Sequence, residues 1–129
     1  MTVSPGLMRA YRLTAYRAAG ISFRIGRRSS ALDSLLLGAD ARHAVLLSAW
    51  NPLSRRMPDG WNRVAERRLR DRLRRDIVWE AEGRLGRWRE AHVLLASDPR
   101  RGLRLARLFR QSAVVVLGRG QMPRLCLLP

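Results

Sequence analysis

The chain has 129 residues, a length that suits one domain with a buried core. Hydrophobic residues make up 47% of it and charged residues 28%, a balance that excludes a disordered chain. The formal net charge is +16, because 26 basic residues, all of them Arg, face only 10 acidic ones. Such an excess attracts polyanions, but the use of Arg without Lys is also typical of a GC-rich genome. The charge therefore fits either a polyanion-binding role or genome composition.

Membrane and secretory classes are not indicated by the sequence. The longest uncharged apolar stretches, Ala44–Trp50 and Ser112–Gly118, are too short to span a bilayer. Residues Met1–Met8 lack the basic and then apolar pattern of a secretory signal. The single cysteine, Cys126, cannot form an internal disulfide and suits a reducing compartment. We therefore expect a cytoplasmic bacterial protein without a transmembrane segment.

The first elements in chain order are a hairpin and a short helix. Residues Tyr11–Ala19 and Ile21–Ile25 are rich in strand-forming residues and are separated by Gly20, which predicts two paired strands. Residues 31–37 then predict a helix, with Ser30 as its N-cap and Gly38 at the position after its end that favours glycine.

A buried strand and a long helix follow. The apolar run 44–49 stops at Trp50, Asn51 and Pro52, which predicts a strand that ends abruptly in a loop over 51–60. Residues 61–75 predict a helix whose buried face carries Ala65, Leu69 and Leu73, with Trp61 beside them.

The second half of the chain predicts a hairpin, a helix and two final strands. The hairpin comprises residues 77–82 and 88–96, joined across Gly83 to Gly86. Asp98 can cap a helix over 99–110, since Pro99 at its first position loses no hydrogen bond. Residues 112–117 and 123–128 predict a buried strand and an edge strand.

Together these elements give the order β-β-α-β-α-β-β-α-β-β. This order predicts an α+β fold: a single compact domain, residues 1–129, with about three helices packed on a mostly antiparallel or mixed sheet. Residues 1–10 precede the first predicted strand and are free to fray.

Several short motifs, taken in order, resemble one known family. They are Thr14-x-Tyr16, Ser48-Ala49-Trp50-Asn51-Pro52-x-Ser54, Asn62, Trp88-x-Glu90 and Phe109-x-Gln111-x-Ala113. The chain is similar, from about Tyr11 to Leu127, to the bacterial family catalogued as domain of unknown function 3293. The resemblance implies a small bacterial domain and supplies no activity, cofactor or catalytic residue.

A set of polar and aromatic residues near predicted strand ends could form a ligand pocket. They are Tyr16, Trp50, Asn51, Ser54, Asn62, Trp88, Glu90 and Gln111. The alternative is structural: Asn51 and Ser54 bond a turn, Asn62 caps a helix, and both Trp side chains belong to the core. Glu90 and His92 face the same side of a strand and could act as an acid–base pair, but no orienting group is identifiable. Catalytic residues stay unassigned, and we expect no metal and no cofactor.

The Arg residues of the two longer helices are candidates for phosphate contact. They are Arg63, Arg67, Arg70 and Arg74 on the first, and Arg100, Arg104 and Arg107 on the second. Our first functional hypothesis is a non-enzymatic protein that binds nucleic acid, or another polyanion, through these residues. The alternatives are a small-ligand-binding or enzymatic protein that uses the strand-end pocket, and a regulatory module with an acidic protein partner. The alternative without a binding function is that these Arg residues form a solvated helix face.

Overall fold

The computed structural model describes residues 3–128. Its elements in chain order are α1 (Pro5–Leu13), β1 (Ala15–Ala18), β2 (Ile21–Phe23), α2 (Ser30–Gly38), β3 (His43–Leu47), the 3-10 turn η1 (Pro52–Ser54), α3 (Asp59–Arg72), β4 (Val78–Leu85), β5 (Trp88–Ala96), α4 (Pro99–Leu108), β6 (Ala113–Gly118) and β7 (Arg124–Leu127). The predicted α+β class is confirmed, and from β1 onward the helices and strands follow the predicted order.

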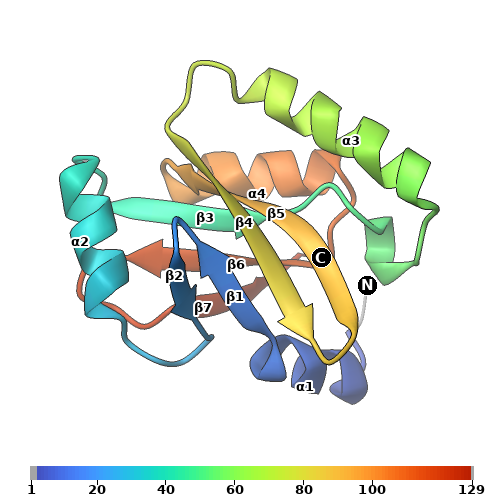
Figure 1. Cartoon of the computed structure of the whole chain (residues 1–129), viewed down its shortest axis with the longest axis horizontal. Helices are drawn as coiled ribbons and strands as arrows, with labels where there is room; N and C mark the ends of the chain where they lie inside the picture. The colour runs from blue at the N-terminus through green and yellow to red at the C-terminus, as the bar shows by residue number, and fades with distance from the viewer. Residues whose placement is uncertain (1–2, 129) are drawn as a thin grey trace.

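The seven strands form one curled, half-barrel sheet in the order β2-β1-β4-β5-β3-β6-β7 (Figure 1). Every neighbouring pair is antiparallel. The sheet therefore needs no parallel crossover, which agrees with the hairpins predicted from the glycine-containing turns. The long β4–β5 hairpin lies at its centre.

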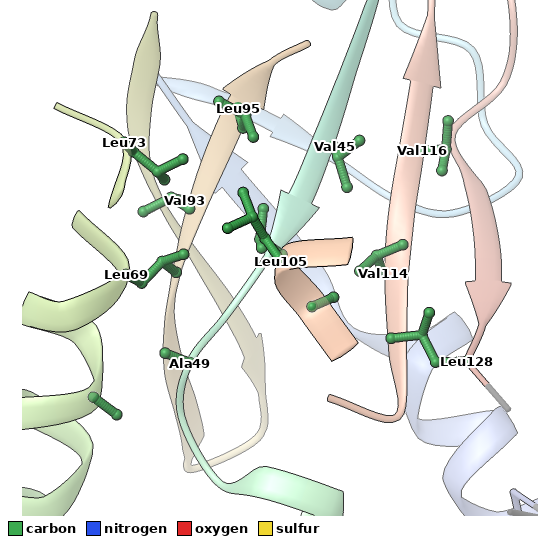
Figure 2. Close-up of a cluster of buried hydrophobic side chains, with 13 residues drawn as sticks. Val45, Ala49, Leu69, Leu73, Val93, Leu95, Leu105, Val114, Val116 and Leu128 are labelled. Carbon is green, nitrogen blue, oxygen red and sulfur yellow. The ribbon is translucent and has the colours of Figure 1, made fainter. Parts of the chain in front are cut away.

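Each face of the sheet has its own hydrophobic core. On one face, α3 contributes Leu69, its C-cap residue is Leu73, and α4 contributes Leu105. These side chains pack on alternate residues of the central strands such as Val45 and Val93 (Figure 2). On the other face, α2 places its buried leucines against β1, β3 and β5. Successive apolar residues of β3 and β5 point to opposite sides, so both faces of the sheet are apolar and both are covered by helices. Burial of Ala65, Leu69 and Leu73 is as predicted, whereas Trp61 is 43% exposed and does not join them.

The N-terminal helix α1 was not expected. The sequence predicts a strand from Tyr11, but the chain is helical as far as Leu13 and the strand begins only at Ala15. The Ser4 hydroxyl accepts a hydrogen bond from the Leu7 amide at 3.1 Å, and Pro5 occupies the first turn. Helix α4 begins in the same way, with Asp98 as its N-cap and Pro99 in its first turn. The same start signal was therefore present in both places. Of the segment 1–10, the first two residues lie outside the described part of the chain.

Two boundary predictions also need correction. The N-cap of α2 is Ser29 rather than Ser30, because the Ser29 hydroxyl accepts the bond from the Leu32 amide at 3.2 Å. Strand β4 continues through Gly83 to Leu85 instead of turning at Gly83, and Gly83 pairs with Tyr16 on one side and Glu90 on the other. Within residues 3–128, no helix has the length and apolar character needed to cross a membrane.

Candidate functional site

A cavity of about 710 Å³ lies at one end of the sheet, beside α1. Strand β3 stops at Leu47, which pairs with Val93, so residues 88–92 of β5 project beyond it. The chain after β3 turns toward this projecting hairpin, and α1 and the start of β6 close the remaining sides. The cavity is lined by all eight residues of the predicted pocket: Tyr16, Trp50, Asn51, Ser54, Asn62, Trp88, Glu90 and Gln111.

Two asparagines hold the loop after β3 in place. The Asn51 amide donates to Asn62 Oδ1 at 3.0 Å, and Asn62 Nδ2 donates back to Asn51 Oδ1 at 3.0 Å. Asn51 Oδ1 also accepts from the Met57 amide at 2.9 Å, and Asn51 Nδ2 donates to Glu90 Oε2 at 3.1 Å. Asn62 is thus a buried partner of Asn51 and not a helix cap, since α3 begins three residues earlier and has no side-chain cap. The Asn51 side chain is occupied by protein partners, which makes it a positioning residue.

The same loop holds backbone strain. Asn51, Leu53 and Ser54 have φ values of 51°, 54° and 61°, a left-handed conformation that non-glycine residues rarely adopt. Contacts with the segment before β6 hold them there: the Leu53 amide donates to the Arg110 carbonyl at 2.6 Å, and the Ser54 and Ser112 hydroxyls are 2.9 Å apart. Strained segments of this kind persist only when their surroundings fix them, and they cluster at functional sites.

Gln111 fixes the other end of the loop. Its Nε2 donates to the Trp50 carbonyl at 3.0 Å and to the Phe109 carbonyl at 3.2 Å. Trp50 Nε1 is the one buried side-chain polar atom in residues 3–128 without a hydrogen-bond partner. A buried unpaired donor costs about 1–3 kcal/mol. Trp50 lines the cavity, and its indole N–H is a buried donor that the described part of the chain leaves unsatisfied.

Glu90 is a buried carboxyl group on this wall. Its side chain is 12% exposed, and Asn51 Nδ2 donates to its Oε2 at 3.1 Å. Burial raises the pKa of Glu90 from 4.5 to about 7, and the side chains of Asn51 and Ser48 only partly oppose this effect. Arg89, the next residue, points to the other face of the strand and pairs with Glu82 at 2.8 Å. The carboxyl is therefore poised between its two protonation states near neutral pH.

His92 lies beside Glu90 and carries the opposite shift. Burial lowers the pKa of His92 from 6.5 to about 4, so the ring is neutral at neutral pH. His92 Nδ1 lies 3.1 Å from the backbone oxygen of Glu90, an acceptor that places the proton on Nδ1. Nε2 then carries the lone pair and lies 3.8 Å from Glu90 Oε1. That distance is too long for a direct hydrogen bond.

Two tyrosines complete the inner wall. Tyr16 lies edge-on to the His92 ring, with ring centroids 5.8 Å apart, and burial raises its pKa above the usual range. Gly83 makes this packing possible, because a Cβ atom there would lie 3.2 Å from Tyr16 and 3.3 Å from His92. Burial also raises the pKa of Tyr11, opposed by the Ser54 and Ser112 hydroxyls. Tyr11 and Ser112 were not among the predicted pocket residues, since Tyr11 was assigned to a strand and Ser112 carries no local motif.

The Arg residues proposed for phosphate contact lie away from the cavity, on α3 and α4 and just beyond the end of α3. They are exposed except Arg70, which lies 3.3 Å from Glu80 and 3.9 Å from Glu66. A second hollow of about 390 Å³ is lined from both helices by Arg72, Arg101, Arg104, Leu105 and Leu108. Neither Arg72 nor Arg101 was among the predicted phosphate contacts, and Arg101 pairs with Asp76 at 2.6 Å.

Comparison with known proteins gives a family but no activity. Neither the curated proteins nor the solved structures contain a match to this chain. A family model described as protein of unknown function (DUF3293) matches residues 47–114, from the end of β3 to the start of β6. That segment includes Trp50, Asn51, Glu90 and Gln111 of the cavity, whereas Tyr11 and Tyr16 lie outside it. The chain belongs to the DUF3293 family, as its motifs predicted.

Proposed function

We propose that the protein binds a small organic molecule in the 710 Å³ cavity and that Glu90 exchanges a proton with that molecule. The volume falls within the range of cavities that hold cofactor-sized and drug-sized ligands, roughly 300–1,000 Å³. Aromatic walls and a few placed polar groups, the usual composition of such sites, also support binding.

The observation that carries this proposal is the buried Glu90 carboxyl. A buried carboxylate is normally paired with a cation, because its desolvation is costly. Among residues 3–128, Glu90 has no Arg within ion-pair distance, and its close titratable neighbour is His92, which is neutral at neutral pH. A carboxyl with a pKa of about 7 can accept or give a proton at neutral pH, which is the property of a general acid or base.

The four Trp side chains provide a test. Trp50 and Trp88 line the cavity, while Trp61 and Trp79 do not. We expect a library of small polar molecules, screened by the indole N–H signals in nitrogen-15 NMR spectra, to yield compounds that shift the first pair only. The affinity of such compounds should change across about pH 7 in the wild type and lose this pH dependence in Glu90→Gln.

Glu80→Gln is the matched control, because its carboxyl is 83% exposed and lies outside the cavity. This variant should keep the wild-type pH profile. A library that never shifts Trp50 and Trp88 would contradict ligand binding. Cavity ligands whose affinity is independent of pH in the wild type would contradict the role of Glu90 in proton exchange.

We propose as a second function that the exposed Arg residues of α3 and α4 bind nucleic-acid phosphates. Both helices lie on the same side of the sheet (Figure 1), and Arg72 and Arg104 line one hollow between them. This arrangement combines two Arg-rich segments into one basic surface, which supports contacts with successive phosphates. An acidic protein partner would use the same surface.

A further inference from the structure

The cavity has a buried polar interior and a basic rim. Its buried lining includes Asn62 and Thr14, and of its two inner titratable groups His92 is neutral at neutral pH and Glu90 is about half ionised. Three exposed Arg residues, Arg56, Arg87 and Arg89, and one acid, Asp59, lie at the rim. The Arg89 guanidinium is paired with Glu82, so the free charges of the rim are two positive and one negative.

Two of the rim cations are free to meet a ligand. Arg89 already donates to Glu82 at 2.8 Å. Arg56 and Arg87 have no acidic partner within residues 3–128. They come from different segments, Arg56 from the loop between η1 and α3 and Arg87 from the turn between β4 and β5. Two guanidinium groups that approach one opening from separate segments can hold a single anionic group.

Aromatic side chains connect this rim to the interior. Trp88 follows Arg87 directly, lines the cavity and is 43% exposed, so it lies at the opening. Trp50, Tyr11 and Tyr16 line the cavity as well, and the Tyr16 side chain is buried. Flat rings along a cavity wall favour a flat apolar ligand body through stacking and edge contacts. A free inorganic ion would satisfy the rim and leave this wall without a partner.

We propose that the ligand of this cavity is an aromatic anion, with its ring system held inside against the aromatic wall and its carboxylate, sulfonate or phosphate group held at the rim by Arg56 and Arg87. This inference rests on the proposed function, because it names the chemical class of the molecule that the cavity binds. The acid of the rim, Asp59, is outnumbered by these two Arg residues.

Two dyes that differ by one anionic group test this inference. 8-Anilinonaphthalene-1-sulfonate carries a sulfonate, and N-phenyl-1-naphthylamine has the same ring system without it. We expect the sulfonate dye to bind at least about tenfold more tightly, because it adds charge-assisted hydrogen bonds to the Arg residues. Both dyes should shift the indole N–H signals of Trp50 and Trp88 and leave those of Trp61 and Trp79 in place.

The Arg56→Ala/Arg87→Ala double variant should weaken the sulfonate dye about tenfold and the neutral dye less than about twofold. Arg55→Ala/Arg119→Ala removes the same charge from two residues outside the cavity lining and should have little effect on either dye. This control separates the rim from the general attraction of a +16 protein for anions.

The outcomes separate the two proposals. Equal affinity for both dyes, with shifts of Trp50 and Trp88, would overturn the anion inference and leave the ligand cavity intact. Equal loss of sulfonate binding in both double variants would overturn the assignment to Arg56 and Arg87. Binding of neither dye at the cavity would overturn the aromatic-anion inference, while the library screen would still decide whether the cavity binds small polar molecules.

Discussion

Glu90 and His92 should make opposite contributions to the dependence of stability on pH. The pKa of Glu90 rises from 4.5 to about 7 on folding, so the folded state binds more protons than the unfolded state between these values. Stability from this group is present below pH 4.5 and is lost as pH rises to about 7. The pKa of His92 falls from 6.5 to about 4, so its contribution is present above 6.5 and is lost as pH falls to about 4.

Single variants should reveal these two slopes separately. In Glu90→Gln the His92 contribution remains, so the free energy of unfolding should rise with pH from about 4 to 6.5. This variant should exceed the wild type in stability above about pH 7, by up to about 3 kcal/mol, since a pKa unit corresponds to about 1.4 kcal/mol. In His92→Gln the stability should fall with pH from 4.5 to about 7. Urea denaturation over a pH series measures both, and profiles parallel to that of the wild type would contradict the burial argument.

Four of the pocket residues that the sequence predicts lie close to the end or the start of a predicted strand. Trp50 and Asn51 come after an apolar run with a proline, and Glu90 and Gln111 lie near the starts of predicted strands, so chain order alone places them at one end of an antiparallel sheet. The opposed pKa shifts could not be predicted, because they depend on burial by Tyr16, Asn51 and α1. Tyr11 was missed because its helix was missed.

At the scale of elements, the contact between α4 and β3 depends on one glycine. A Cβ atom at Gly102 would lie 2.6 Å from the Cβ of Val45, so α4 could not keep its distance from the sheet. We expect Gly102→Ala to lower the free energy of unfolding by about 1–3 kcal/mol, despite the better helix propensity of alanine. Gly60→Ala is the control: Gly60 has open space around it in α3, and this change should be neutral or stabilising by up to about 1 kcal/mol.

Thermal and urea unfolding of both variants measure this difference. Val45→Ala in the Gly102→Ala background should recover part of the loss, because it removes the methyl groups nearest to the new Cβ. Equal stability of Gly102→Ala and Gly60→Ala would contradict the close packing.

The order of elements was predictable because Gly, Pro and capping residues mark their ends. The close contact of Gly102 was not predictable, because it depends on the pairing of distant segments. Its only trace in the sequence is an isolated glycine within a helical pattern.

At the scale of the whole molecule, part of the +16 charge is concentrated on α3 and α4. Binding to duplex DNA measures whether that surface contacts phosphates. We expect the affinity for a mixed-sequence duplex to fall steeply with salt, since each neutralised phosphate adds about −0.9 to the logarithmic slope. Arg72→Glu/Arg104→Glu should weaken binding at least about tenfold more than Arg24→Glu/Arg27→Glu, which changes the net charge equally outside these helices. Equal effects of the two pairs would show that net charge alone attracts DNA. Salt-sensitive binding to an acidic protein without binding to DNA would assign the same surface to a protein partner.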